Sequence, residues 1–268
     1  MSVQAPDLLT RLLLRVAQRQ PFNRGPLRRR LAKFFEQRIH APVETRFHGV
    51  PFEFNFDNPT EQKALFGHYN LTEVEFVIAA ARQAVPVFVD VGANSGFFTQ
   101  IFLFHATPQA RALAIEPNPR MCQRIERNVR LIADRLCEKS QVLNIENCAV
   151  GDQAATMHLD LSAGFGAAHV VEAPTNNSIE VRIVPLVDIV TSHGLDHIDL
   201  LKIDVEGFED RVLMPFFAAA PRTLFPRRII IEHTSDGDWQ GDLWGALEAA
   251  GYREETRTRG NLLLRLAE

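Results

Sequence analysis

Two glycines four residues apart, Gly92 and Gly96, follow the acidic residue Asp90 in the segment VDVGANSGFFTQ, residues 89–100. Because glycine has no side chain to keep a ligand from the backbone, this spacing predicts that a small molecule approaches closely here. Glu116 follows 24 residues after Gly92, at the end of the next apolar run. A carboxylate at that point accepts hydrogen bonds from both hydroxyls of a ribose. The pattern therefore predicts a ligand that contains a nucleoside with a free ribose diol.

Two kinds of cofactor carry such a nucleoside. NAD places its pyrophosphate on a G-x-G-x-x-G loop, whereas here the spacing is G-x-x-x-G and Asn94 takes the place of the middle glycine. Asp90 would repel a pyrophosphate but attract an ammonium or sulfonium group. S-adenosylmethionine carries both cations and no phosphate, so it is the favoured cofactor. Asp90 is equally interpretable as a structural acid that accepts backbone N–H bonds in the turn.

Candidate catalytic groups follow two later apolar runs. His233 ends the run at residues 227–233 and is the best-placed histidine for a general base, because imidazole changes charge near neutral pH. A histidine that caps the following loop is the structural alternative. Asp204 and Glu206 end the run at residues 198–206 and are alternative bases, with Asp204 also a candidate cofactor ligand. Acids at this position also stabilise the N-terminus of a following helix without any catalytic role.

The acidic residues at these strand ends suggest a metal site as a further hypothesis. Asp204, Glu232 and His233 would converge if their strands are neighbours. Magnesium prefers oxygen ligands, so a histidine in the set disfavours it. We therefore expect no metal ion in the site.

The elements that must position these residues alternate between short apolar strands and helices. The predicted strands occupy residues 85–92, 110–117, 140–150, 198–206 and 227–233, with two more in residues 252–268. This alternation predicts an α/β fold of the Rossmann-like, doubly wound type with a mostly parallel sheet. The last two strands are joined by a short turn at Gly260 and Asn261, which predicts an antiparallel C-terminal hairpin. Ligands bind at the carboxyl ends of the strands in such folds.

Several local patterns predict element boundaries. Thr72 and Glu75 have the spacing of a capping box. Asn118 is a natural N-cap, and apolar residues at helical spacing extend the helix that follows it as far as Leu136. Pro215 is expected to kink or end the helix at residues 208–217. Residues 162–178 form a long loop, interpreted equally well as a substrate lid or as a hairpin extension of the sheet.

The beginning of the chain is strongly basic. Residues 1–40 hold nine Lys or Arg and two Asp or Glu, although the whole chain has a net charge of −4. Leu8, Leu9, Leu12, Leu13 and Val16 would form one face of a helix, with arginines on the other. The favoured interpretation is a surface helix whose apolar face caps the domain. Peripheral contact with an acidic membrane surface, or with nucleic acid, is the alternative.

Composition narrows the classes of protein. No run of eighteen apolar residues indicates a transmembrane helix, and arginines interrupt the apolar stretch that a signal peptide would need. The three cysteines are scattered without a C-x-x-C pair, which is typical of free thiols in a reducing cytoplasm. The acidic remainder of the chain would repel phosphate, so no nucleic-acid substrate is expected. The oligomeric state is left open.

The segments VDVGANSGFFT, AIEPNP and DLLKIDVEGFE resemble the FkbM-type family of class I S-adenosylmethionine-dependent methyltransferases. The third segment is the most specific to that family, and the resemblance spans about residues 72–233. It implies methyl transfer to a hydroxyl oxygen, with a small molecule, sugar or glycan, or natural product as the acceptor. Residues 71–268 are then expected to be the methyltransferase domain, preceded by a basic helical segment and small hairpin in residues 1–70. An NAD-type oxidoreductase and a non-catalytic scaffold that keeps the cofactor pocket are the alternatives.

The resemblance also implies which residues surround the cofactor. On the methionine side the implied residues are Asp90, Gly92, Ala93, Asn94 and Gly96, with Phe97 beside them. The implied ribose ligand is Glu116. The residues implied around the adenine are Pro117, Asn118, Asn147, Ala149 and Val150.

Overall fold

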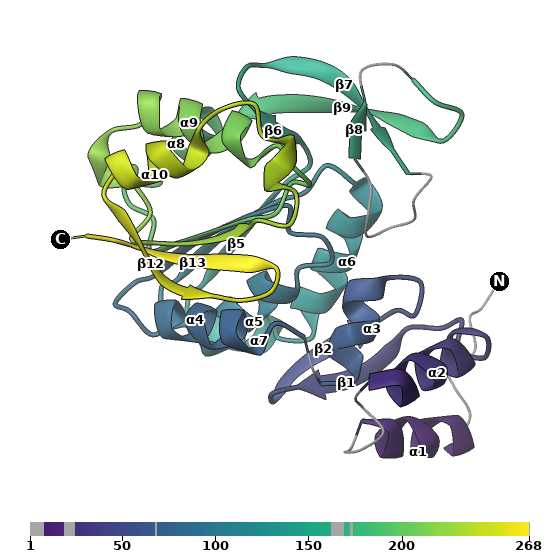
Figure 1. Ribbon diagram of the computed structural model, residues 1–268. Coiled ribbons are helices and arrows are strands. Elements are labelled where there is room, and N and C mark those ends of the chain that lie inside the picture. The colour runs from purple at the N-terminus through teal and green to yellow at the C-terminus, as the bar shows by residue number, and fades with distance from the viewer. Residues whose placement is uncertain (1–7, 19–24, 68, 162–168, 172–173, 268) are drawn as a thin grey trace.

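The computed structural model describes residues 8–18, 25–67, 69–161, 169–171 and 174–267, and a seven-stranded sheet forms its centre (Figure 1). In spatial order the strands are β12 (Tyr252–Arg257), β13 (Asn261–Leu266), β11 (Arg228–Glu232), β10 (Leu200–Ile203), β3 (Val87–Val91), β4 (Arg111–Ile115) and β5 (Val142–Glu146). The five strands from β11 to β5 are parallel, and β13 is antiparallel to both of its neighbours. The predicted doubly wound sheet with its antiparallel C-terminal hairpin is confirmed.

Helices cover both faces of this sheet because its strands are apolar on both sides. In β3, Val87 and Val89 belong to the core on one face, whereas Phe88 belongs to the core on the other. The first face carries α8 (Leu186–Ser192), α9 (Glu209–Ala219) and α10 (Leu243–Ala249), and the second carries α4 (Leu71–Ala81), α5 (Phe97–His105), α6 (Pro119–Arg130) and α7 (Ala133–Glu138) (Figure 1). Asp90 and Lys202 therefore project from the same face as Phe88 and Leu200, toward α5.

The N-terminal elements share the core beneath α5. They are α1 (Leu8–Ala17), α2 (Gly25–Glu36), the antiparallel hairpin of β1 (Val43–Phe47) and β2 (Val50–Phe54), and α3 (Pro59–Leu65). A small hairpin is predicted within residues 1–70, and β1 and β2 form one. Phe47 and Phe52 pack on Phe97 of α5, with ring centroids 5.0 and 5.4 Å apart. One hydrophobic cluster thus joins residues on both sides of position 70. None of the helices in the described part of the chain is long and apolar enough to cross a membrane.

A second, smaller sheet stands beside the main one. Its order is β6 (Ala149–Gly151), β9 (Ser178–Pro185), β7 (Ala155–Asp160) and β8 (His169–Val171). Leu159, Val181 and Ile183 form a small core of its own with Ala149. The predicted strand at residues 140–150 is therefore two strands in different sheets. The predicted lid or hairpin extension at residues 162–178 falls largely on 162–168 and 172–173, which lie outside the described residues; the flanking β7 and β9 pair as an antiparallel hairpin.

Three predicted helix boundaries differ in the structure. The capping box is wrong because α4 begins at Leu71, after Asn70 in a left-handed conformation, which places Thr72 inside the first turn. The helix after Asn118 stops at Arg130, where i to i+3 backbone bonds tighten the chain, and α7 follows as a separate helix. Asn118 does cap α6, accepting a hydrogen bond from the Arg120 N–H. Helix α9 does not end at Pro215 but continues to Ala219.

Candidate functional site

A cavity of about 390 Å³ opens at the carboxyl ends of β3, β4 and β10. The loops after these strands line it, together with β6 and β7 of the small sheet. A second cavity of about 490 Å³ lies at the other end of the strands, lined by residues such as Asp199, Arg227 and Arg265. Because ligands of doubly wound sheets bind at the carboxyl ends of the strands, the first cavity is the candidate site.

The glycine loop after β3 is built by contacts within the protein. The N–H groups of Gly92 and Ala93 both donate to the Ile115 carbonyl at the end of β4, over 2.9 and 3.1 Å. Gly92 has a φ of +72°, and a Cβ there would overlap the carbonyl oxygen of Asp204. Gly96 has a φ of +79°, and a Cβ there would lie 3.0 Å from Ile125 of α6.

These contacts correct the predicted reason for the two glycines. Gly92 lines the cavity but Gly96 does not, and both are required where the loop meets neighbouring protein atoms. Close approach of a ligand therefore applies to Gly92 alone. The glycine spacing holds the loop against β10 and α6, which fixes the floor of the cavity.

Glu116 is the carboxylate that faces the cavity from β4. Its Oε2 accepts the Asn94 N–H at 2.8 Å, and its Oε1 accepts the Asn118 N–H at 2.9 Å. Burial raises the pKa of Glu116 to about 7, although both backbone bonds oppose the rise. Each oxygen keeps a second lone pair, so the carboxylate can still accept two hydroxyl groups. These two acceptor oxygens fit the hydroxyl groups of the ribose in the predicted cofactor.

Asn94 is held in place by a residue that sequence reasoning missed. Its Oδ1 accepts hydrogen bonds from the Asn58 side chain and the Ser95 N–H, both at 2.8 Å. Asn94 has a φ of +51° and lines the cavity. Asn58 is buried and caps α3 through the N–H of Thr60. An N-terminal element thus fixes the conformation of the cofactor loop.

Asp90 lies beneath the cavity and does not line it. It is buried, and its Oδ2 accepts a 2.7 Å hydrogen bond from the Thr99 hydroxyl. Burial raises the pKa of Asp90, with Lys202 opposing the rise. The predicted direct contact of Asp90 with a cofactor cation is therefore replaced by its structural alternative. The physical reason is that Asp90 shares the covered face of β3 with Phe88.

Lys202 of β10 is the second residue that sequence reasoning missed. Its Nζ donates to the Gly92 carbonyl at 2.9 Å and lies 3.5 Å from Asp204 Oδ2 and 3.7 Å from Asp90 Oδ1. Burial alone would lower the pKa of Lys202, but Asp204 and Asp90 outweigh it and raise the pKa. The side chain is thus an ammonium that lines the cavity and pairs with two acidic side chains.

The predicted adenine surroundings divide into lining and supporting residues. Pro117, Ala149 and Val150 line the cavity. Asn118 and Asn147 do not: Asn118 caps α6, and the Asn147 side chain donates to the Glu116 and Pro117 carbonyls at 2.9 Å. Both asparagines therefore shape the loops around this end of the cavity without facing it.

Ala93 and Phe97, the residues predicted for the methionine side, line the cavity. Tyr69 and Thr60 also line it, and they come from the N-terminal part of the chain. Tyr69 packs against the Phe97 ring at 5.2 Å. Burial, followed by the charge of Asp204, raises the pKa of Tyr69 to about 12, so its hydroxyl stays protonated and can donate a hydrogen bond.

The three catalytic candidates separate in the structure. Asp204 and Glu206 line the cavity, and Asp204 is partly exposed. His233 does not line the cavity. Its ring Nε2 lies 3.3 Å from the Thr258 carbonyl, and its backbone N–H donates to the Gly260 carbonyl. Its strand, β11, is separated from β3 by β10, so the ring meets the β12–β13 turn. The cavity gives no support to His233 as the base.

The acidic loop after β10 is held by Glu209 at the start of α9. Its Oε1 accepts the Val205 N–H at 2.9 Å, and its Oε2 accepts the Trp239 ring N–H at 2.8 Å. These bonds fix the loop that carries Asp204 and Glu206. Within the described residues, no group of three or more His, Cys, Asp or Glu side chains is arranged to hold a metal ion.

Known proteins that resemble this chain are methyltransferases. The 2-O-methyltransferase NoeI of Sinorhizobium fredii is 26% identical over 185 residues, which cover 62% of this chain and 71% of NoeI. The 31-O-demethyl-FK506 methyltransferase FkbM of Streptomyces tacrolimicus is 29% identical over 158 residues, which cover 47% of this chain and 58% of that protein. The solved structure of a methyltransferase FkbM from Methylobacillus flagellatus KT aligns with a TM-score of 0.48 at 16% identity, covering 78% of this chain and 54% of that one.

The family with the description "Methyltransferase FkbM domain" matches residues 90–254. This range contains the glycine loop, Glu116, Lys202 and Asp204, and it leaves out Asn58 and Tyr69. The match covers more than half of the chain and includes the residues that build the cavity floor. The chain therefore belongs to the FkbM family of methyltransferases.

Proposed function

We propose that this protein is an S-adenosylmethionine-dependent O-methyltransferase whose acceptor is a hydroxyl of a small molecule, sugar or natural product. The observation that carries the proposal is that Glu116 and Asp204 line one cavity from the two sides of the glycine loop. Their strands, β4 and β10, are the two neighbours of β3. A ligand with a ribose at one end and a cation at the other fits this arrangement of charges.

The residues present fit S-adenosylmethionine. Glu116 would accept the ribose hydroxyls, and Ala149 and Val150 would pack against the adenine. Asp204 takes the role that the sequence suggested for Asp90, because its carboxylate lines the cavity beside the floor of the loop. When bound, the cofactor supplies an electrophilic methyl group. The protein then has to orient the acceptor and receive its proton.

Asp204 and Glu206 are the candidate proton acceptors for the acceptor hydroxyl. As the acceptor oxygen gains the methyl carbon, its proton passes to one of these carboxylates. The Lys202 ammonium lies 3.5 Å from Asp204 Oδ2 and pairs with this carboxylate at the edge of the cavity. Tyr69 is a hydrogen-bond donor in the same cavity and would help to orient the acceptor oxygen.

The names of two relatives support oxygen as the methylated atom. NoeI is described as a 2-O-methyltransferase, and the Streptomyces protein acts on 31-O-demethyl-FK506. The chain spans less than two thirds of the length of the Streptomyces protein, so the likeness supports the reaction type and leaves the acceptor to experiment.

Calorimetric binding of S-adenosylhomocysteine tests the cofactor assignment. We expect binding by the wild type and a loss of roughly 10- to 100-fold in Glu116→Ala, because hydrogen bonds to a charged group are removed. Glu126→Ala is the matched control, since this exposed carboxylate of α6 pairs only loosely with Arg130 at 3.8 Å. Binding of NAD without binding of S-adenosylhomocysteine would overturn the proposal.

Transfer of a labelled methyl group to a panel of sugars, phenols and aliphatic alcohols tests the reaction. The expected product carries a new methyl ether, identified by NMR spectroscopy. A product methylated on nitrogen or carbon would contradict the choice of oxygen. Tight cofactor binding without transfer to any of these hydroxyl compounds would favour the non-catalytic scaffold.

A further inference from the structure

The sequence favours an α1 helix whose apolar face caps the domain. The structure differs. Among the side chains of α1 that the structure describes, which begin at residue 12, Leu14 and Ala17 are buried, whereas Leu12, Leu13 and Val16 are exposed by 58, 41 and 45%. Leu8 and Leu9 of the predicted apolar face lie outside these described side chains. Residues 12 and 16 lie on the same face of the helix, and residue 13 lies on the adjoining face. They form an apolar strip that no described residue covers.

Helix α2 adds to this surface. It buries Phe35 and leaves Leu27 and Phe34 exposed by 39 and 37%. Five of the nine exposed large apolar residues in the described part of the chain therefore lie on these two helices. The two helices pack against each other at one end of the molecule, and Phe35 of α2 packs on Phe56 and Phe66, which lie on either side of α3 (Figure 1).

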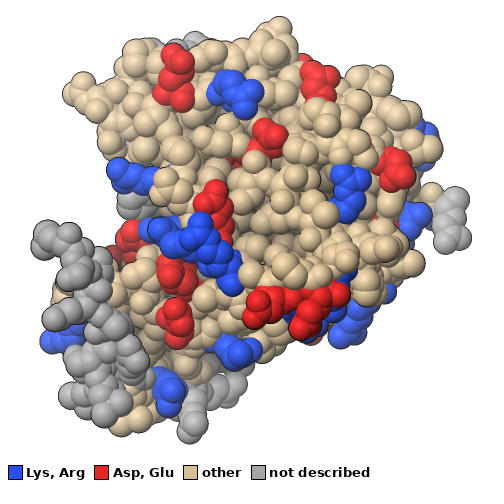
Figure 2. Space-filling model, turned by 180° about the vertical axis from the view of Figure 1, so that it is seen from behind, with Lys and Arg blue, Asp and Glu red and all other residues tan. Residues whose placement is uncertain are grey.

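Basic side chains surround these apolar residues. Arg15 of α1 and Arg29, Arg30 and Lys33 of α2 are exposed. None of the four forms an ion pair with another described residue, and Glu36 is the one acidic residue in the two helices. Over the rest of the face drawn in Figure 2, by contrast, acidic and basic side chains are interspersed. The positive charge at this end is not neutralised locally.

We infer that α1 and α2, the N-terminal surface, dock the protein on the anionic surface of a lipid bilayer. Amphipathic helices that lie in a membrane interface combine exposed apolar residues with Lys and Arg in this way. Leu12, Leu13 and Val16 enter the boundary of the acyl chains. The arginines and Lys33 then meet the lipid phosphates.

The positive charge and the exposed apolar residues favour a lipid bilayer over two other partners, a second copy of the chain and a nucleic acid. A second copy of the chain would bring two positive surfaces together, which opposes association. A nucleic acid would be bound by the basic residues alone and would leave Leu12 and Val16 in water, since phosphate contacts do not require exposed aliphatic side chains. A bilayer with acidic lipids satisfies both kinds of residue.

The N-terminal surface is continuous with a wall of the candidate site. Thr60 and Tyr69, from the segment that follows β2, line the cavity, and Gln18 at the end of α1 donates to the Leu65 carbonyl of α3 at 2.9 Å. Docking through α1 and α2 would thus place this wall of the cavity close to the bilayer surface. The inference stands on the exposed residues and does not depend on the methyl acceptor.

Co-sedimentation of the full chain with vesicles tests the inference. One set of vesicles is phosphatidylcholine alone, and the other contains phosphatidylcholine and phosphatidylserine in a 7:3 ratio. We expect sedimentation with the acidic vesicles that weakens as salt is added, and little with the neutral ones. Absence of sedimentation with the acidic vesicles at low salt would overturn the inference.

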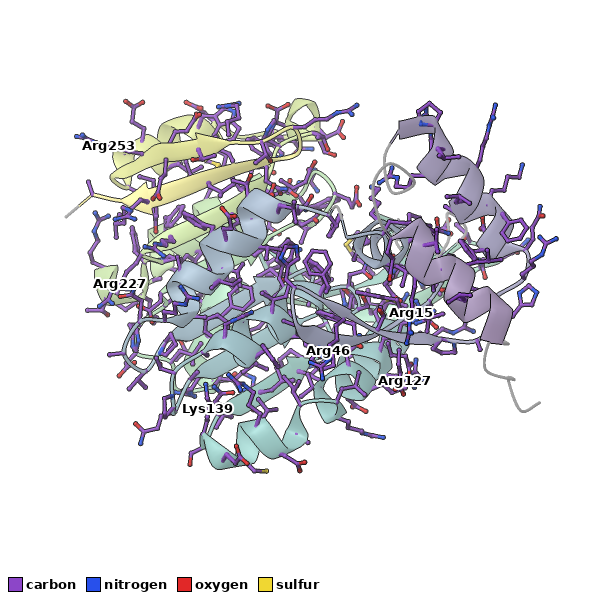
Figure 3. The ribbon with its side chains drawn as sticks, turned by 90° about the horizontal axis from the view of Figure 1, so that it is seen from below. Arg15, Arg46, Arg127, Lys139, Arg227 and Arg253 are labelled. Atoms are coloured by element: carbon purple, nitrogen blue, oxygen red, sulfur yellow. The ribbon has the colours of Figure 1, made fainter. Side chains whose placement is uncertain are left out.

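Two pairs of matched variants identify the surface. Arg29→Gln with Arg30→Gln should weaken vesicle binding roughly fivefold for each charge removed. Arg253→Gln with Arg259→Gln is the charge control; Arg253 lies at the opposite end of the molecule from Arg15 (Figure 3). Leu12→Gln with Val16→Gln should also weaken binding, whereas Leu71→Gln with Val142→Gln, at exposed apolar residues elsewhere, should not. All these residues are exposed, so the melting temperatures should agree within a few degrees.

Three results would count against the membrane. Equal losses in the test and control variants would show that net charge, and no defined surface, causes binding. A dimer in solution that Leu12→Gln with Val16→Gln dissociates, without vesicle binding, would assign the surface to a second copy. Binding of a transfer RNA that depends on Arg29 and Arg30 but not on Leu12 and Val16, again without vesicle binding, would assign it to nucleic acid.

Discussion

The Asn58 side chain donates a 2.8 Å hydrogen bond to the Oδ1 of Asn94, 36 residues further along the chain. Asn58 belongs to the N-terminal part of the chain, before the range that the family match covers, and Asn94 belongs to the cofactor loop. The same Oδ1 accepts the Ser95 N–H, so the bond fixes the orientation of the Asn94 amide. The N-terminal part therefore takes part in building the site.

Asn58→Asp separates this bond from the capping of α3. A carboxylate still accepts the N–H groups of Thr60 and Glu61, but it cannot donate to Asn94. We expect the affinity for S-adenosylhomocysteine to fall about tenfold with little change in the melting temperature. Asn58→Ala should lose the cap as well, and with it about 1 kcal/mol of stability. Wild-type affinity in Asn58→Asp, measured by calorimetry, would show that the bond does not shape the loop.

Glu116 should make the stability of the free protein depend on pH. Burial raises its pKa from 4.5 to about 7, so below pH 4.5 the carboxyl is protonated in both the folded and the unfolded chain. As the pH rises toward 7, the unfolded chain loses its proton first, and stability is lost by up to ~3 kcal/mol. Glu116→Gln does not titrate, so its stability relative to the wild type should rise between pH 5 and pH 8. Urea unfolding of both proteins checks this, and a constant difference would contradict it.

Lys202 and Asp90 should behave as a coupled pair. Lys202→Met leaves the buried Asp90 carboxylate without its cation, which we expect to lower the free energy of unfolding by ~3 kcal/mol or more. Asp90→Asn in the same background removes the stranded charge and keeps an acceptor for Thr99, so a large part of the loss should be recovered. A double-mutant cycle in urea measures the coupling. Simple additivity of the two substitutions would mean that the two groups do not interact.

Asp204 and His233 should differ in their effect on methyl transfer. Asp204→Asn removes a carboxylate from the cavity, and the turnover number should fall ~100-fold or more. His233→Gln should change it less than about threefold, because the ring contacts the Thr258 carbonyl outside the cavity. Initial rates with any accepted hydroxyl compound provide the comparison. A large loss in His233→Gln together with unchanged S-adenosylhomocysteine binding would restore His233 as the base.

Gly92 and Gly194 give a matched test of the loop's close packing. Both have positive φ, +72° and +59°, but a Cβ on Gly92 would overlap the Asp204 carbonyl, whereas one on Gly194 would meet nothing within 4 Å. Gly194→Ala should cost about 1 kcal/mol from backbone conformation alone. Gly92→Ala should cost ~3 kcal/mol or more and weaken cofactor binding as well. Equal stabilities in urea would show that β3 and β10 are not in close contact at this point.

The central sheet could be predicted from the sequence because each of its strands is marked by a local pattern of residues. Each strand is a short apolar run, and the residues that directly follow β4 and β10, Glu116 and Asp204, do line the cavity. Asn58 and Tyr69 could not be predicted, because their contacts with the loop and with α5 arise only when the N-terminal hairpin packs on the domain. Lys202 did leave a signal, since a lysine inside the apolar strand LLKI needs a partner for its charge.

Boundaries failed where a neighbouring conformation overrode a local pattern. Thr72 and Glu75 match a capping box, but Asn70 adopts a φ of +44° and starts the helix earlier. The strand at residues 140–150 reads as one apolar run, although Ala149 pairs with Ile183 in the second sheet. His233 directly follows its strand, which ends at Glu232, and its side chain faces the β12–β13 turn because β13 is the next strand.

The small sheet of β6 to β9 has a core of its own and supplies Ala155, Met157 and Ile183 to one wall of the cavity. It is linked to the main body by contacts of β6 and β9 with α9, by contacts of β9 with α8, and by the chain on either side. This layout separates the surface that a ligand meets from the framework that folds around β3. Grafting residues 152–182 from a relative with a different acceptor onto this framework should therefore exchange selectivity while keeping the cofactor floor, which makes the small sheet the natural unit for engineering.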